Sequence, residues 1–275
     1  MRKIIIYIVL LLCLIPAFPL QAQSNGLGRY WDDTDFSDTT LIDSKELTSK
    51  LIDFLFSFTD GDEHRFDSLS IVGLGTVLDM AKANMEVYEF ILQFALRGYT
   101  AMGRTAVTDY LLNYPKLAEG EITAEEGRRL DSITEPFQKV KVGAKAPDYK
   151  GVTIDGKIYS IYGSKARRTL VVFWSTDCEY CHDFLVQIRK HLNLKRKYEL
   201  VTFALAESQE EVTAMVKKMR LRGYHFYDEL RWEGKAFLDY HITSTPTVFL
   251  LDEKKTIVCK PYDWNELKEW LKRNK

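Results

Sequence analysis

The spacing of apolar residues divides the chain into two parts that meet near residue 140. Before that point, apolar residues recur every three to four positions, as in helices that bury one face. This pattern predicts five helical segments, around residues 47–56, 69–81, 87–96, 107–112 and 122–140. Gly98 is expected to end the third segment and Pro115 the fourth, and Thr123 and Glu126 stand at capping-box spacing in the fifth. Residues 24–40, which are acidic and contain glycine and threonine, are expected to form a loose lead-in.

After residue 140, short apolar runs alternate with helical patterns. Strands are predicted at 157–161, 170–174, 200–205, 247–251 and 256–259, and helices at 178–197, 210–220, 235–240 and 264–272. Asp155-Gly156 predicts a hairpin turn before the first strand. Continuous apolar strands of this kind are typical of a sheet covered by helices on both faces. The sequence therefore predicts a small all-α domain at 23–140 followed by an α/β domain at 141–275.

The first 22 residues predict a secretory signal peptide. Arg2 and Lys3 precede an apolar stretch over residues 4–18, and Ala22 lies where cleavage is expected. The stretch is shorter than an ordinary membrane-spanning helix, although a retained N-terminal anchor is the alternative. Lipidation of Cys13 is disfavoured because leucines, not small residues, precede it. The expected location is periplasmic or secreted.

Charge and cysteine content restrict the class of protein further. Loss of Arg2 and Lys3 with the signal would change the formal charge from -1 to -3, which gives no reason to expect nucleic acid or an anionic membrane as partner. The remaining cysteines are Cys178, Cys181 and Cys259. Three cysteines do not make a dense disulfide framework, and this set suits a redox enzyme in an oxidising compartment.

Two features separated in the sequence indicate thiol–disulfide chemistry. Cys178 and Cys181 begin a predicted helix directly after the strand at 170–174, where the helix N-terminus stabilises a thiolate on the first cysteine. Thr245-Pro246 enters a later strand and is a candidate cis peptide bond that would bring backbone beside the sulfurs. Cys178 is thus the expected nucleophile and Cys181 the cysteine that resolves the mixed disulfide.

Each of these residues also has a simpler interpretation. The cysteine pair could form a structural disulfide or remain two buried thiols, and Pro246 could be an ordinary trans proline at a strand start. Trp174 is expected to shield the thiols and to contact substrate, but it could equally be a core aromatic. Cys259 is most simply a small buried hydrophobe in a strand.

Other chemistries fit the sequence less well, and neither a cofactor nor a metal is expected. Residues 178–182, Cys-Glu-Tyr-Cys-His, match the haem c attachment pattern, but that pattern leaves the preceding strand and Thr245-Pro246 unexplained. A zinc site lacks a second ligand pair at suitable spacing. A peroxiredoxin-like peroxidase is the enzymatic alternative because of residues 147–149, Pro-Asp-Tyr, although Thr176 lies two residues before Cys178 rather than three as in that family's motif. The non-enzymatic alternative is a binding or assembly protein that acts through its helical domain.

Residues 142–272 resemble a thioredoxin-like domain, and within that group the secreted bacterial TlpA/ResA-like thiol–disulfide oxidoreductases. The matching blocks are Gly-Ala-Lys-Ala-Pro-Asp at 143–148, Val-Val-Phe-Trp-Ser-Thr-Asp-Cys-Glu-Tyr-Cys at 171–181, and Tyr-His-Ile-Thr-Ser-Thr-Pro-Thr-Val-Phe-Leu-Leu-Asp at 240–252. The helical part resembles, more weakly, the domain that precedes such domains in some secreted bacterial proteins.

The resemblance implies a central mixed sheet with helices on both faces and disulfide exchange with protein substrates. It also implies that the Thr245 backbone, beside Pro246, pairs with an extended substrate segment. Glu179 and Tyr180, between the cysteines, are expected to contact the substrate as well. A membrane protein is a candidate electron donor.

The chain departs from the family at three positions. Val172 replaces the buried acid that many thioredoxins carry six residues before the first cysteine, and Val186 replaces a helix-kinking proline. Glu179-Tyr180 replaces the common Gly-Pro or Pro-Pro between the cysteines. A carboxylate at Glu179 disfavours a thiolate on Cys178, and a less stable thiolate makes a less oxidising couple. The sequence therefore favours a reductant.

Overall fold

The computed structural model describes residues 29–56, 63–117, 122–192 and 197–274. The chain divides into two compact units, Met1–Ile91 and Leu92–Lys275, and the division falls inside helix α5 (Met85–Ala101). The domain boundary near residue 140 stays a prediction, and the predicted signal peptide lies outside the described residues. No helix in the described ranges has both the length and the apolar character needed to cross a bilayer.

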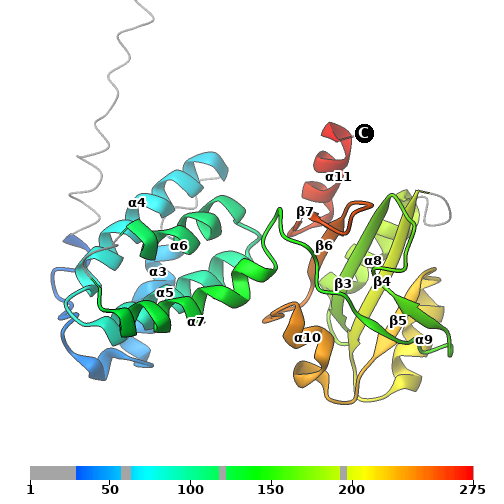
Figure 1. The fold of residues 1–275 in the computed structure, drawn as a ribbon, viewed down its shortest axis with the longest axis horizontal. Coiled ribbons are helices and arrows are strands. Elements are labelled where there is room, and N and C mark those ends of the chain that lie inside the picture. The colour runs from blue at the N-terminus through cyan, green and yellow to red at the C-terminus, as the bar shows by residue number, and fades with distance from the viewer. Residues whose placement is uncertain (1–28, 57–62, 118–121, 193–196, 275) are drawn as a thin grey trace, which may run out of the picture. The chain divides into compact units, whose positions relative to one another are not determined.

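The first unit is helical. Its elements are the short 3-10 helix η1 (Thr39–Leu41), α3 (Lys45–Phe56), α4 (Glu63–Ala81) and the first part of α5 (Figure 1). Trp31 is completely buried, with its ring centroid 5.1 Å from that of Phe54 and 5.7 Å from that of Phe36. The expectation of a loose lead-in is therefore wrong for residues 31–36, because burial of these aromatic rings fixes the segment against α3.

The second unit begins with the rest of α5, followed by α6 (Thr105–Leu117) and α7 (Ala124–Lys139). Two predicted helix ends are wrong. Helix α5 continues past Gly98, because a glycine costs a helix only about 1 kcal/mol and the buried Tyr99 prolongs the apolar face. Helix α6 extends through Pro115 to Leu117, because the fixed φ of proline, about −65°, is compatible with a helix although its missing N–H costs one backbone hydrogen bond. The capping box of α7 is confirmed, since the Thr123 hydroxyl accepts from the Glu126 N–H and the Glu126 carboxylate accepts from the Thr123 N–H.

The α/β part contains a hairpin and a mixed sheet (Figure 1). Strands β1 (Lys150–Val152) and β2 (Ile158–Ser160) form the predicted hairpin. The five-stranded sheet has the order β5-β4-β3-β6-β7, with strands β3 (Arg168–Ser175), β4 (Tyr198–Leu205), β5 (Tyr224–Tyr227), β6 (Thr247–Leu251) and β7 (Ile257–Cys259). Strands β3, β4 and β5 are parallel, whereas β6 runs antiparallel to β3 and β7 antiparallel to β6. The predicted mixed sheet is confirmed.

Strand β5 at the edge of the sheet is absent from the sequence prediction. It follows Gly223, whose φ of +154° and close approach to β4 exclude a side chain, because a Cβ there would lie 2.2 Å from the Leu200 carbonyl oxygen. Within β5, His225 is buried, and its Nδ1 lies 2.9 Å from the Thr202 hydroxyl on β4. A histidine inside an apolar strand weakens the hydrophobic signal on which the prediction depends.

The two faces of β3 pack against different layers. Leu170, Val172 and Trp174 lie in one core with helices α8 (Glu179–His191), α9 (Gln209–Met219) and α11 (Trp264–Arg273). Val171 and Phe173 lie in a second core with α10 (Lys235–Asp239) and the hairpin. All five of these strand residues are completely buried, and burying side chains of this size contributes about 1.5–3 kcal/mol each. This double coverage holds the carboxyl end of β3, and therefore the loop after it, in one place.

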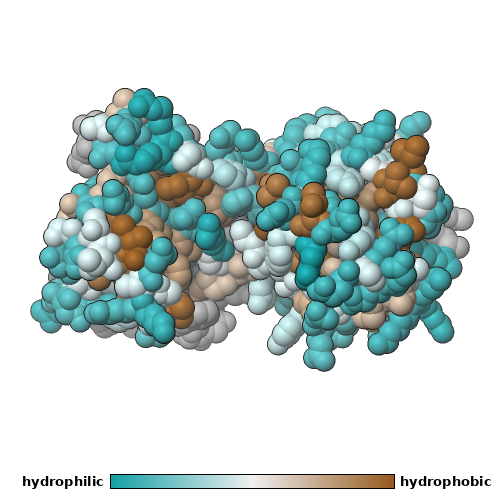
Figure 2. Space-filling model, turned by 90° about the horizontal axis from the view of Figure 1, so that it is seen from below, coloured by the Kyte–Doolittle hydropathy of each residue, from teal (hydrophilic) through white to brown (hydrophobic). Residues whose placement is uncertain are grey.

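The surface has no single dominant apolar area on the face drawn in Figure 2, where hydrophobic residues form small separate patches among hydrophilic ones. The most exposed large apolar side chains of the described residues are Tyr180, Ile158, Leu238, Val152 and Leu230. Scattered exposed apolar residues are normal on soluble proteins. Of these five, Tyr180 is the one that lies between the two cysteines.

Candidate active site

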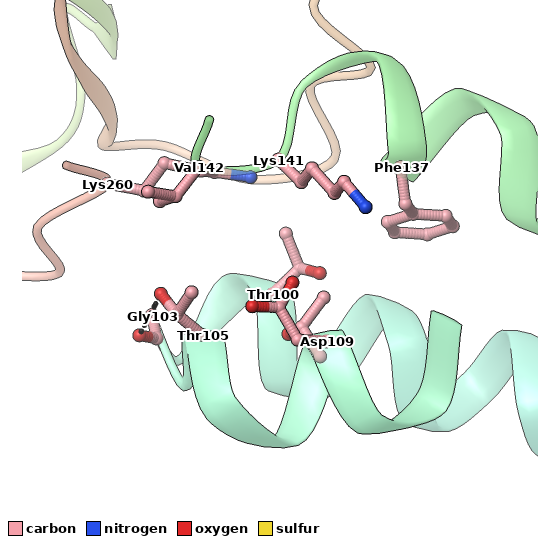
Figure 3. Close-up of a pocket in the computed structure, with 9 residues that line it drawn as sticks. Thr100, Gly103, Thr105, Asp109, Phe137, Lys141, Val142 and Lys260 are labelled. Carbon is pink, nitrogen blue, oxygen red and sulfur yellow. Dashed lines mark hydrogen bonds between the residues drawn. The ribbon is translucent and has the colours of Figure 1, made fainter. Parts of the chain in front are cut away.

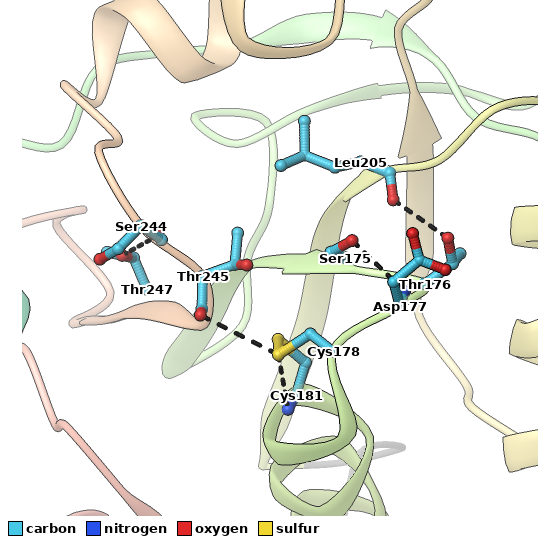
Figure 4. Close-up of a disulfide and its surroundings, with 9 residues drawn as sticks. All are labelled: Ser175, Thr176, Asp177, Cys178, Cys181, Leu205, Ser244, Thr245 and Thr247. Atoms are coloured by element: carbon cyan, nitrogen blue, oxygen red, sulfur yellow. Dashed lines mark hydrogen bonds between the residues drawn. A yellow bond between two sulfur atoms is a disulfide. The ribbon is translucent and has the colours of Figure 1, made fainter.

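The loop between β3 and α8 is anchored at the carboxyl edge of the sheet (Figure 4). The Thr176 N–H donates to the Leu205 carbonyl at the end of β4, with a distance of 3.0 Å, and the Thr176 hydroxyl lies 3.3 Å from the same oxygen. The Asp177 N–H donates to the Ser175 hydroxyl over 3.3 Å. These bonds join the ends of two parallel strands, so the residue that starts α8 is held directly above the sheet. Sequence reasoning did not identify Thr176, although a threonine just before a helix start is a usable signal.

Cys178 is the N-cap of α8 and forms a disulfide with Cys181, with an S–S distance of 2.14 Å. The Cys181 N–H donates to the Cys178 Sγ over 3.1 Å, as capping side chains accept from the first turn of a helix. Cys178 is half-buried, whereas Cys181 has no exposed surface. An incoming sulfur can therefore reach Cys178 but not Cys181.

The loop that precedes β6 approaches the disulfide from a distant part of the sequence (Figure 4). The Thr245-Pro246 peptide bond is cis, which confirms the prediction and excludes the trans alternative. The Thr245 carbonyl oxygen lies 3.9 Å from the Cys178 Sγ, and the Thr247 hydroxyl donates to the Ser244 carbonyl over 2.7 Å. In the reduced protein, a Cys178 thiol would have this carbonyl as a hydrogen-bond acceptor.

The other predicted site residues differ in their exposure to solvent. Glu179 is exposed, and 84% of the Tyr180 side-chain surface is accessible to solvent. Trp174 is completely buried in the core that contains Cys181. It is therefore a core aromatic beneath the pair, and its predicted contact with substrate stays a prediction.

Two polar atoms in this core have no hydrogen-bond partner among the described residues. They are the Trp174 Nε1 and the His182 Nε2, whose rings meet edge to face with centroids 6.0 Å apart. Val172, at the position of the family's buried acid, is itself completely buried, so β3 presents no carboxylate to Cys181. The core that contains Cys181 thus includes the Trp174 indole, and the His182 imidazole meets that indole at its edge.

The third cysteine of the described residues, Cys259, has different surroundings from Cys178. Cys259 is free and buried in β7, where it packs in the same core as Leu250 and Leu267. Burial raises the pKa of the Cys259 thiol to about 12, because the apolar core disfavours a thiolate. The structure therefore places it as the small buried hydrophobe that the sequence indicates. Within the described ranges, no three or more His, Cys, Asp or Glu side chains are grouped so as to hold a metal ion.

Two cavities have no cysteine among their lining residues. One, of about 20 Å³, has Lys141 and Lys260 opposite Thr100, Thr105 and Asp109, and it has room for about one water molecule (Figure 3). Burial lowers the pKa of Lys260 to about 8 and raises that of Asp109 above its usual value. A more open hollow of about 460 Å³ is lined by Pro136, Lys139, Lys145, Pro147, Leu238, Asp239 and His241. Neither of these two cavities is lined by Cys178 or Cys181.

Comparison with known proteins agrees with this geometry. A family model described as a thioredoxin-like domain matches residues 157–261, which include both cysteines of the pair and Thr245-Pro246. The sporulation thiol-disulfide oxidoreductase A of Bacillus subtilis is 30% identical over 123 residues, covering 43% of this chain and 74% of that protein. This chain belongs to the thioredoxin-like thiol–disulfide oxidoreductases.

Two further comparisons extend the likeness. The oxidoreductase is 29% identical over 125 residues to the thioredoxin-like protein YneN of Bacillus subtilis, covering 43% of this chain and 69% of that protein. The crystal structure of a thioredoxin-like protein from Bacteroides caccae aligns with a TM-score of 0.61 and 19% identity, covering 95% of this chain and 96% of the other. At that identity the structural match shows the fold alone. It includes the helical part, which the family model leaves out.

Proposed function

We propose that this oxidoreductase exchanges disulfides with protein substrates through Cys178 and Cys181, acting as a reductant. One observation carries the proposal. A half-exposed sulfur at a helix N-terminus, 3.9 Å from the Thr245 carbonyl oxygen, is bonded to a fully buried second sulfur one helical turn away. The accessible sulfur can attack, and the buried one can reach only its neighbour.

The exchange balances in two steps. The Cys178 thiolate attacks one sulfur of a substrate disulfide, forming a mixed disulfide, and the other substrate sulfur leaves as a thiolate that takes up a proton. Cys181 then loses its proton and attacks the Cys178 sulfur, forming the intramolecular disulfide and releasing the second substrate thiol. Two electrons and two protons pass to the substrate. A dithiol donor must reduce the pair again before the next cycle.

The surroundings of Cys178 suit an extended polypeptide. The Thr245 carbonyl stands beside the sulfur next to Pro246, where substrate backbone can pair with it as an added strand. Glu179 and Tyr180 offer exposed side chains to residues that flank the substrate cysteine. Trp174 supports the pair from the core side.

The direction of electron flow follows from Glu179. Its carboxylate is adjacent in sequence to Cys178 and opposes the helix N-terminus, which would otherwise favour a thiolate. A less stable thiolate makes the dithiol form easier to oxidise, which is the property of a reductant.

We further propose that the protein works outside the cytoplasm. The support is the N-terminal pattern of Arg2 and Lys3, the apolar residues 4–18 and Ala22. In an oxidising compartment a reductant needs a supply of electrons, so a membrane dithiol protein is the proposed donor. Residues 23–140 form the proposed helical domain and 141–275 the proposed exchange domain, with no role for nucleic acid.

The first test is the equilibrium redox potential of the Cys178–Cys181 couple, titrated in the purified protein against dithiothreitol or glutathione. A value near about -270 mV, the thioredoxin end of the range, supports the reductant. A value near about -120 mV would reverse the proposed direction. A pair that does not titrate reversibly would exclude disulfide exchange altogether.

Location needs a separate measurement. The full chain is expressed in a Gram-negative host, the cells are fractionated, and the mass of the product is determined. The proposal predicts periplasmic protein that begins just after Ala22. Full-length protein in the cytoplasmic fraction would contradict it.

A further inference from the structure

The rim of the disulfide carries charge of one sign. Asp177, Glu179 and Asp183 are all exposed and lie within seven consecutive residues around the pair. Neither residues 175–185 nor the facing loop, residues 243–247, contain a lysine or an arginine. The accessible sulfur therefore lies within a region of three negative charges.

These charges are not neutralised by neighbours. In the described part of the chain, none of the three carboxylates forms an ion pair. Glu207, in the loop after β4, is paired with Arg231 over 2.8 Å. The loop before β6 contributes the Thr245 carbonyl oxygen, which is itself a partial negative charge. The formal side-chain charges beside Cys178 are thus negative, and such charges attract cations and repel anions that approach the sulfur.

A second feature of the rim is independent of these carboxylates. Tyr180 is the most exposed of the large apolar residues in the described chain, at 84%. It stands between the two cysteines with no ring partner among the described residues. An open aromatic ring attracts lysine and arginine side chains through its electron-rich face.

From these two observations we infer that the site prefers disulfides flanked by lysine or arginine and discriminates against anionic ones such as oxidised glutathione. The inference rests on the proposed function and names its substrate class. The covalent steps are those described above. The carboxylates act on the encounter with substrate, and Tyr180 holds the bound cation.

The test compares three small disulfides that differ in charge: cystamine, which is cationic, oxidised glutathione, which is anionic, and bis(2-hydroxyethyl) disulfide, which is neutral. The second-order rate constant of the reduced protein is measured with each, at low salt and at high salt. The quantity compared is the rate constant for cystamine divided by that for oxidised glutathione. We expect this ratio to be on the order of tenfold higher at low salt than at high salt, because salt screens the three charges near the sulfur. A ratio that does not change with salt would overturn the inference.

Variants separate this effect from a change in sulfur reactivity. The triple variant Asp177→Asn/Glu179→Gln/Asp183→Asn should lower the low-salt ratio by about tenfold and remove its salt dependence. The control variant Glu46→Gln/Asp131→Asn/Glu253→Gln removes as much charge from exposed positions on other elements and should keep the wild-type ratio. Any change in the reactivity of Cys178 itself affects all three disulfides alike and cancels in the ratio.

Tyr180 is tested at high salt, where the carboxylates are screened. Tyr180→Leu should lower the rate constant for cystamine by about two- to fivefold relative to the neutral disulfide.

Equal ratios in the two triple variants would overturn the inference even if exchange is fast. Failure to react with the neutral disulfide would instead contradict the proposed function, so the two outcomes are distinguishable.

Discussion

The carboxyl edge of the sheet and its interior place their cysteines in different surroundings. At the edge, Cys178 is half-exposed, caps a helix and faces a backbone carbonyl. In the interior, the Cys259 thiol has its pKa raised to about 12 by burial, and the His225 imidazole has its pKa lowered to about 4. Both interior groups are therefore neutral at pH 7. A cysteine or histidine can therefore react through its charged form only where the fold leaves that form solvated or partnered.

The largest difference between the two regions is expected when one cysteine is removed from each. Cys178→Ser should lower the rate of insulin disulfide reduction, with dithiothreitol as donor, by about a thousandfold or more, because the attacking sulfur is lost. Cys259→Ser should stay within about twofold of wild type in the same turbidity assay. Cys181→Ser serves as a positive control and should accumulate a mixed disulfide that is visible by mass spectrometry. Equal losses in the two regions would show that the contrast is wrong.

A second prediction compares the reactivity of the two regions in one molecule. In the reduced protein at pH 7, iodoacetamide should label Cys178 at least about a thousandfold faster than Cys259, because a thiol with a pKa of about 12 has that much less thiolate than an ordinary cysteine. Peptide mass spectrometry over a time course gives both rates. In urea-unfolded protein the two rates should converge, and a persistent difference there would show that burial is not the cause.

The third prediction concerns His225 and acid. Its pKa is about 4 in the folded chain, lowered mainly by burial, against 6.5 in the absence of such effects. Between these values the unfolded state binds more protons, so stability falls as the pH drops below about 6.5 and the loss is complete near pH 4. The full loss is about 3 kcal/mol, of which about 2 kcal/mol appears by pH 5. Urea unfolding of the oxidised protein at pH 7.5 and pH 5 measures it.

The matched variant for this measurement is His225→Asn. It should lose less stability between the two pH values than wild type, by about 2 kcal/mol, since it has no imidazole to protonate. If wild type and variant differ in free energy of unfolding by the same amount at both pH values, another group causes the acid sensitivity. His241 is an example, since burial also lowers its pKa.

The smallest expected effect concerns the buried hydrogen bond between Thr202 and His225. Thr202→Val removes the hydroxyl that lies 2.9 Å from the His225 Nδ1 while keeping the shape of the side chain. The free energy of unfolding should fall by about 1–3 kcal/mol, because a buried polar atom is left without a partner. Thr213→Val, on an exposed turn of α9 where the hydroxyl bonds only its own helix, should change it by less than about 0.5 kcal/mol. Similar losses in both variants would mean that the buried hydrogen bond contributes nothing special.

Much of the fold was predictable because its signals are local. The amphipathic helices, the capping box at Thr123 and the apolar strands each depend on residues a few positions apart. Strand β5 was missed because its apolar run is interrupted by His225, and its place is set by pairing with β4 at Gly223. The helix ends predicted at Gly98 and Pro115 are wrong because neither residue excludes helical backbone. Glycine costs about 1 kcal/mol, and proline, which costs about 3 kcal/mol, still has a helical φ.

The redox residues can be identified from the sequence: two cysteines one helical turn apart, and a Thr-Pro pair before a strand. Tertiary structure alone decided that these segments meet, with 3.9 Å between the Cys178 sulfur and the Thr245 oxygen, although 67 residues separate them in the chain. It also decided that Trp174 lies in the core and Tyr180 in solvent. The physical reason is that spacing along the chain sets local conformation, whereas burial and proximity depend on how β3 and β6 pair in the sheet.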